Sequence, residues 1–237
     1  MKTRAFLLIL GLSGLLPAQN DNFTRLQDEW MGLRFRTSTV KLSTLSMESQ
    51  VYAAGYEGKV GYGGTLRFYG GFTRTGVPSG DSLITDFKGD RALYLEGSWD
   101  QALAFLFVTA GTRWYKAVGT VKEDLGRVTN RYANSYMIWE FPVQAGVRIP
   151  IRWVTLELGV SQTYYYGKDD VKIQVVDGGK TVDFGSVNQT FIDHQNLLYR
   201  GNVRIKLTPD YTLGLEVETD AGATTIYSLT LYTPVKK

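Results

Sequence analysis

One stretch near the middle of the chain, residues 137–160, alternates between apolar and polar side chains with a period of two. In its first half the odd positions are apolar, while Glu140, Gln144 and Arg148 stand at even positions between them. The alternation breaks at residues 149–151 and then resumes. Because successive side chains of a strand point to opposite faces, this pattern predicts two strands, each apolar on one face, joined by a tight turn.

The same alternation recurs along most of the chain and predicts an all-β protein of about ten strands, with eight also possible. The connections alternate in length, and short turns are expected at 63–64, 100–101, 149–151 and 209–210. Longer polar loops are expected at 43–49, 75–90, 116–134 and 167–195, with 220–222 as a short exception. Residues 171–187 suggest an extra hairpin standing above the rest. This arrangement is typical of a transmembrane antiparallel up-and-down β-barrel, whereas a β-sandwich uses Greek-key crossings.

The N-terminal segment is predicted to be a signal peptide that is removed on export. Lys2 and Arg4 precede an apolar run that is too short to span a membrane as a helix, and Ala18 offers a cleavage point. The predicted organisation is a signal peptide (1–18), a lead-in segment with helical spacing (19–32), a β-barrel domain (33–233) and a C-terminal tail (234–237).

The balance of charge gives no sign of an anionic partner. Without Lys2 and Arg4 the chain has 24 basic and 23 acidic residues, so nucleic-acid binding is not expected. The absence of cysteine excludes a disulfide framework. No apolar run after the signal approaches the roughly 20 residues that a membrane-spanning helix needs. A mature protein in a membrane would therefore cross it as strands.

The polar faces of the expected strands carry more arginine than lysine, with carboxylates in nearly equal number. In a membrane barrel the apolar faces contact lipid and the charged faces fill the lumen, where arginine pairs well with carboxylates. The predicted lumen charge network consists of Arg34, Arg36, Glu57, Arg67, Arg91, Glu96, Glu140, Arg148, Glu157, Arg200, Arg204, Glu216 and Glu218. Such side chains would largely fill the bore of a barrel of about ten strands, so an open channel is not expected.

Large aromatic residues fall near both ends of several expected strands. In membrane barrels such residues form girdles at the two water–lipid boundaries. The predicted girdle residues are Trp99, Trp139, Trp153, Tyr164 and Tyr211. The alternative is that they are ordinary aromatic residues of a β-rich core.

With these features the chain resembles the small bacterial outer-membrane β-barrels, the class that includes opacity-type and adhesin-type barrels. The resemblance covers nearly all of the chain after residue 18 and is architectural. It implies short periplasmic turns, extracellular loops open to an external ligand, contact with outer-membrane lipids and lipopolysaccharide, and a monomer. The chain departs from the class at one point. Such barrels usually end on an aromatic residue, but Tyr232 is followed by five further residues.

Four residues are candidates for catalysis at the outer rim. His194 is the only histidine, and Asp193 adjoins it, with Asp169 and Asp170 at the other root of the same expected loop. A histidine with carboxylates can act as a general base, as in omptin-type proteases. However, adjacent residues of a strand point to opposite faces, so a solvated loop histidine is the favoured interpretation. A lipid A acyltransferase or deacylase would need a histidine–hydroxyl set that the chain does not supply.

No cofactor or metal site is expected. One histidine and no cysteine leave only carboxylates as metal ligands. The acidic turns at 80–81 and 168–170 could hold calcium, but solvated turns are favoured. Neither a phosphate-binding loop nor a dinucleotide fingerprint is present.

The expected function is a structural or surface-interaction role in the bacterial outer membrane. Partners would meet the loops at 75–90, 116–134 and 167–195. The alternatives are a narrow porin-like channel and an enzyme that acts on lipid A or on surface peptides.

Overall fold

The computed structural model describes most of the chain from Glu29 onwards. The described residues are 29–41, 46–60, 63–77, 87–125, 128–177, 179–220, 222 and 224–235. The predicted signal peptide (1–18), residues 19–28 of the predicted lead-in and residues 236–237 of the predicted tail lie outside them. The first strand begins at Glu29, so it includes the last four residues of the segment expected to precede the barrel.

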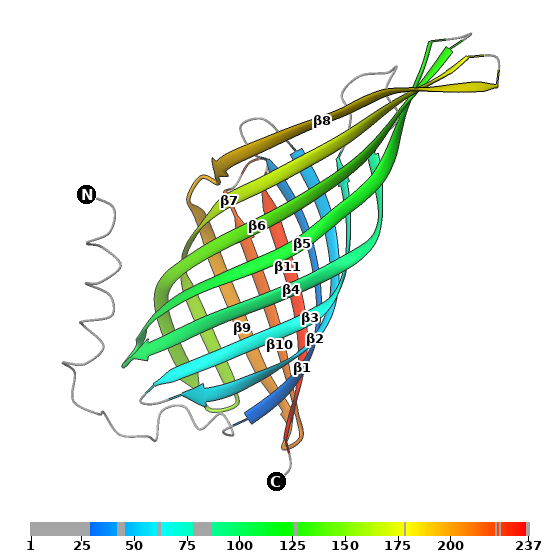
Figure 1. Ribbon diagram of the computed structural model, residues 1–237. Coiled ribbons are helices and arrows are strands. Elements are labelled where there is room, and N and C mark those ends of the chain that lie inside the picture. Colours follow the sequence, from blue (N-terminus) through cyan, green and yellow to red (C-terminus); the bar gives the residue numbers. More distant parts are fainter. Residues whose placement is uncertain are drawn as a thin grey trace.

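Eleven antiparallel strands make up the described part of the chain (Figure 1). They are β1 (Glu29–Lys41), β2 (Ser46–Val60), β3 (Gly64–Val77), β4 (Phe87–Leu103), β5 (Leu106–Asp124), β6 (Val128–Ile151), β7 (Val154–Asp177), β8 (Lys180–His194), β9 (Leu198–Thr208), β10 (Tyr211–Thr219) and β11 (Thr225–Pro234). In these ranges we find no helix with the length and apolar character needed to cross a membrane.

The strands form a single closed sheet. Each strand from β1 to β6 pairs with its neighbour in the sequence, β1 pairs with β11, and β6 pairs with β7 along its whole length. The first part of β7 (Val154–Ser161) pairs with β9, and the rest (Tyr164–Asp177) pairs with β8. Strands β8 and β9 therefore follow one another along the same edge of β7. This closure confirms the predicted all-β, antiparallel up-and-down barrel.

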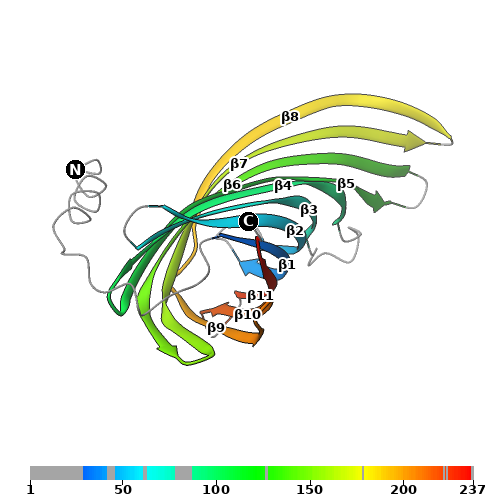
Figure 2. The same ribbon diagram turned by 90° about the horizontal axis from the view of Figure 1, so that it is seen from below.

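The strand number differs from the prediction of about ten, or eight. The additional strand is β8, the returning arm of the hairpin expected inside 167–195. Strands β6, β7 and β8 reach well beyond the ring that the other strands form (Figure 2). We call the part of β5–β8 beyond this ring, residues 116–125, 128–135, 168–177 and 179–191, the projecting sheet.

Two predicted turns are displaced. Residues 100–101 belong to β4, and the turn follows at Ala104-Phe105; residues 149–151 belong to β6, and the turn follows at Arg152-Trp153. Ala104 and Arg152 have positive φ angles of 57° and 48°. Tight hairpin turns require positive φ, which is usually signalled by glycine or asparagine. Because neither residue is present at these two turns, no local residue signals them.

Two predicted loops are largely strand. Residues 116–134 continue β5 and β6 to within a few residues of each other, and residues 167–195 are almost entirely β7 and β8. Residues 75–77 and 87–90 of a third predicted loop are also strand, whereas residues 78–86 lie outside the described part. The sequence predicts loops at these segments because they do not continue the pattern of apolar outward and polar inward residues of the other strands. Their backbones nevertheless pair in register with the neighbouring strands.

The two faces of the barrel wall differ sharply in chemistry. The buried side chains include six of the arginines and several carboxylates, hydroxyls and tyrosines, whereas exposed side chains include many leucines, phenylalanines and valines. On β3, for example, Arg67 and Tyr69 are buried while Phe68 and Phe72 between and beyond them are exposed. The wall is therefore polar inside and apolar outside, the reverse of a soluble barrel.

Candidate functional site

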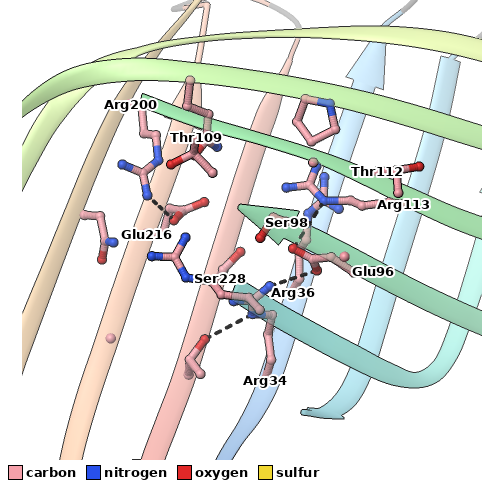
Figure 3. A pocket seen from close by; sticks show the side chains of 18 of the residues that line it. Arg34, Arg36, Glu96, Ser98, Thr109, Thr112, Arg113, Arg200, Glu216 and Ser228 are labelled. Carbon is pink, nitrogen blue, oxygen red and sulfur yellow. Dashed lines mark hydrogen bonds and ion pairs between the residues drawn. The ribbon is translucent and has the colours of Figure 1, made fainter. Parts of the chain in front are cut away.

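The lumen holds a network of arginine and carboxylate side chains. Seven arginines and seven carboxylates of the described residues meet there: Arg34, Arg36, Arg67, Arg113, Arg148, Arg200 and Arg204, with Glu57, Glu96, Asp100, Glu140, Glu157, Glu216 and Glu218. Side chains from β1, β4, β5, β9 and β10 point toward one another across the bore (Figure 3). Because the formal charges cancel, the network can be buried without leaving a net charge uncompensated.

Glu157 is the centre of one half of this network. Its carboxylate accepts hydrogen bonds from Arg148 Nε at 2.7 Å, Arg200 Nη1 at 3.0 Å and Asn202 Nδ2 at 2.9 Å. Arg148 also reaches Asp100, with 2.9 Å between Nη2 and Oδ2. These groups come from four strands, β4, β6, β7 and β9, so the network ties opposite arcs of the wall together.

Glu57 is the centre of a second group. Tyr69 donates its hydroxyl to Glu57 Oε1 at 2.8 Å. Arg67 Nε lies 3.4 Å and Arg204 Nη1 lies 3.6 Å from Oε2. The guanidinium of Arg34 stacks over the Tyr69 ring, 3.9 Å from its centroid. Each of these charged side chains therefore has an ion-pair or hydrogen-bond partner in the interior, although the Nε atoms of Arg67 and Arg204 form no hydrogen bond.

Glu96 and Glu140 form a third group, lined by tyrosines. Arg34 Nη1 lies 2.8 Å from Glu96 Oε2, and Arg113 Nη1 lies 3.1 Å from Glu140 Oε2. Tyr94 donates to Glu96 at 2.6 Å, and Tyr115 similarly donates to Glu140 at 2.9 Å. The tyrosines thus supply both hydrogen bonds and bulk in the bore.

The structure places twelve of the thirteen predicted lumen residues inside the barrel. The exception is Arg91, which is exposed and shares its face with Leu93 and Leu95. Its odd position puts it on the outward face of β4, opposite to Glu96, so its assignment to the lumen was wrong.

Two charged residues of the lumen were missed. Asp100 lies where the sequence predicts a turn, and Arg113 lies in a stretch, Ala102–Tyr115, that is mainly apolar on both faces. A signal for Arg113 was present, because it is the only charged residue of that stretch and shares its face with Thr109. Four tyrosines, Tyr69, Tyr94, Tyr115 and Tyr165, are also buried in the interior, although the predicted network contains only charged side chains.

Little free space remains in the bore. The cavity among these side chains measures about 40 Å³ and is lined by groups such as Arg36, Arg67 and Glu216. On this measure one water molecule occupies about 10–15 Å³. This cavity therefore has room for a few water molecules.

Exposed aromatic residues mark two levels on the outer wall. Trp153 and Tyr211 are exposed at the turn end, where Trp99 is half-buried, and Trp139 and Tyr164 are exposed at the other level. Along β7, ten residues separate Val154 from Tyr164. At about 3.3 Å per residue and a tilt of about 40°, this stretch rises about 25 Å, the height of the apolar band of membrane barrels.

The polarity of the wall reverses beyond the upper aromatic level. In the barrel, the outward face of β7 carries apolar residues at even positions; above Tyr166 the even positions become Lys168, Asp170 and Lys172. The inward, odd positions change from Glu157 and its neighbours to Val171, Ile173 and Val175. Strand β6 changes in the same way, with Tyr132 and Tyr136 facing inward. The outward face of the projecting sheet is therefore polar.

The four candidate catalytic residues are not brought together. Asp193 is buried and accepts a hydrogen bond from the backbone N–H of His194 at 2.8 Å, whereas the exposed imidazole of His194 packs against Tyr164. Asp170 pairs in register with Asn188, five residues before Asp193. The side chain of Asp169 lies outside what the structure describes. Among the described residues there is no cluster of three or more His, Cys, Asp or Glu side chains able to hold a metal ion.

The geometry defines a class: a closed antiparallel β-barrel with a polar interior and an apolar outer band. No protein-family model matches the chain, and no curated protein matches it by sequence. Among solved structures, the translocator domain of the autotransporter NalP from Neisseria meningitidis aligns with 99% of this chain and 96% of its own, at a TM-score of 0.54 and 10% identity. The β domain of the Bordetella autotransporter BrkA aligns with 88% of this chain and 99% of its own, at a TM-score of 0.53 and 13% identity. The chain thus shares the fold of outer-membrane β-barrels, as predicted.

Proposed function

We propose that the protein is an outer-membrane β-barrel with a closed lumen, exported by a cleaved signal peptide, whose projecting sheet acts at the cell surface. The observation that carries this proposal is the reversal of polarity along β6 and β7. An outward apolar face is favourable only against lipid, and an outward polar face only against water. The reversal point, near Tyr166, is therefore the proposed upper surface of the membrane.

The residues just above this level support contact with lipopolysaccharide. Lys116, Met137 and Lys168 stand side by side on the outward face of β5, β6 and β7, with both lysines exposed. Lysine side chains at the edge of an apolar band reach toward anionic head groups. In this proposal the two lysines meet the phosphate groups of lipopolysaccharide.

The packing of the lumen supports a non-conducting barrel. The cavity among the paired arginines and carboxylates measures about 40 Å³, which favours a bore without a path for hydrated ions. The test is conductance of the full-length protein in planar lipid bilayers, on samples whose folding is checked by heat-modifiable gel migration. We expect no current steps from folded protein. Discrete ohmic steps would overturn the closed lumen in favour of a narrow channel.

A surface-interaction role is favoured because the projecting sheet is not required for the barrel to span the membrane. Strands β6 and β7 each have 24 residues, about twice the length that a membrane strand requires. The additional length serves no purpose in spanning. In this proposal it presents a surface to an external partner from a single barrel.

A further inference from the structure

The outer edge of β8 is unpaired. Among the described strands, β8 pairs with β7 alone and stands at the end of the sheet order. One hydrogen bond just after the strand, from Gln195 N to Thr163 O at 2.9 Å, shows which residues of β8 direct their backbone groups toward β7. In an antiparallel ladder, pairs two residues apart repeat this bonding, and the residues between them point their N–H and C=O groups away. The groups directed away from β7 belong to Ser186, Asn188, Thr190, Ile192 and His194.

The lower end of this edge is closed by a side chain. The N–H of His194, the last residue of β8, is bonded to the carboxylate of Asp193 at 2.8 Å. This bond agrees with that assignment, because it uses an N–H that points away from β7. The open part of the edge therefore runs upward from Ile192, which pairs with Tyr166 at the base of the projecting sheet, to Ser186.

The open edge lacks the usual protection against strand addition. Residues 184–192, FGSVNQTFI, include no charged residue and no proline. Native edge strands are normally blocked by lysine, proline, inward charges or bulges. Here the one such feature is an irregularity of register beside Ile173, at the far end. Moreover, the apolar side chains are exposed, at 68% for Phe184 and 83% for Ile192.

We propose that the β8 edge between Ser186 and Ile192 receives an extended segment of a partner protein as an additional strand. This inference rests on the proposed function, since it needs the edge to stand outside the membrane. Main-chain hydrogen bonds would supply affinity, and side chains at alternate positions would supply specificity. The segment that fits is uncharged, with apolar residues beside Val187 on the inward face and small polar residues beside Asn188 and Thr190 on the outward face.

A second copy of the chain fits this edge poorly. Two barrels in one membrane stand the same way up, so their two-fold axis lies along the membrane normal. Strand β8 descends toward the barrel in each copy, because it pairs with β7 from the tip to Tyr164. Symmetric pairing of the two edges as antiparallel strands would require one copy to ascend.

The test uses the full-length protein in lipid nanodiscs and a fluorescent peptide of alternating threonine and valine, about six residues long, the usual length of a strand. Asn188→Pro removes an N–H from the open edge without removing a bond to β7; Asn188→Ala is the matched control, since it changes the side chain and keeps the N–H. We expect the proline variant to weaken binding about tenfold or more and the alanine variant to bind like the wild type.

Amide hydrogen exchange gives a second readout that does not depend on variants. On binding the peptide, the amides of Asn188, Thr190 and Ile192 are expected to slow about tenfold, whereas Gln189 and Phe191 are already protected by β7. Equal binding by the proline variant, or no binding by folded wild-type protein, would overturn the proposal. If the wild-type protein is a dimer and the Asn188→Pro variant is a monomer, the occupant of the edge is a second copy of the chain, and the proposed partner segment is overturned. Heat-modifiable migration of the same samples tests the barrel itself, so the two failures are distinguishable.

Discussion

Removing the carboxylate of Glu157 tests whether the lumen network holds the barrel together. This side chain is buried and accepts from Arg148, Arg200 and Asn202 at 2.7–3.0 Å. Breaking a buried ion pair by deleting one partner costs about 3–5 kcal/mol, because a charge is left uncompensated. Here both arginines keep a second carboxylate, since Arg148 retains Asp100 and Arg200 retains Glu216. The loss in free energy of unfolding for Glu157→Ala is therefore expected at the lower end, about 3 kcal/mol.

The matched control is Glu216→Ala. It removes a carboxylate from the same Arg200, but this side chain is 21% exposed and its partner keeps the bond to Glu157. A partly solvated pair contributes about 1 kcal/mol or less. Denaturant unfolding of the protein in micelles, followed by tryptophan fluorescence, measures both losses. Increasing the salt concentration should weaken the effect of Glu216→Ala more than that of Glu157→Ala, because buried pairs are poorly screened. A Glu157→Ala variant as stable as Glu216→Ala would refute the reasoning.

Three further predictions concern other parts of the molecule. Gly55→Ala should lower the temperature of heat-modifiable migration, because a Cβ there would lie 2.5 Å from the ring of Tyr69, whereas Gly201→Ala, which has open space, should not. In the β10–β11 connection, the backbone N–H groups of residues 224 and 222 hold the pKa of the Asp220 carboxyl below its ordinary value. This contribution is present above the ordinary pKa of about 4 and is lost as the pH falls through the lowered pKa. The protection of those two amides from hydrogen exchange, measured against the intrinsic exchange rate at each pH, should therefore fall on acidification in the wild type, and Asp220→Ala should show little protection at every pH. Finally, Lys168→Glu should weaken binding of lipopolysaccharide in a micelle assay; unchanged binding would exclude the proposed phosphate contact.

The sequence predicted the part of the fold that the lipid constrains. On strands with one charged face, such as those carrying Glu57 and Arg67 or Arg200 and Arg204, alternation alone identified the lumen side chains. It did not do so for β5, where a single arginine stands among apolar residues, nor for Asp100, whose neighbour made it resemble a turn residue. The prediction assigned Arg91 to the lumen because of its charge, although its odd position puts it on the same outward face as Leu93.

Of the projecting sheet, the sequence predicts only the hairpin at 171–187, and the continuity of this hairpin with the barrel strands was missed for a different reason. Residues 168–175 do alternate with a period of two, but with apolar residues at odd positions, the opposite phase to residues 154–160. A prediction that assumes the same phase of alternation along the whole strand therefore places a loop at this segment. In the proposed membrane orientation the change of phase reflects a change of solvent outside the wall, and the sequence alone does not say which solvent lies on which side. The unpaired edge of β8 depends on strand order, which alternation does not determine.

The uninterrupted course of β6 and β7 has a mechanical consequence. Each strand runs for 24 residues, roughly 80 Å at about 3.3 Å per residue, with no hinge between the membrane wall and the tip. A pull applied to the tip along the strands acts on many ladder bonds at once, in shear, instead of opening them one by one. A partner bound at the tip should therefore dissociate before the barrel unfolds. A sideways force on the tip should rotate the whole barrel, because no hinge separates the tip from the wall.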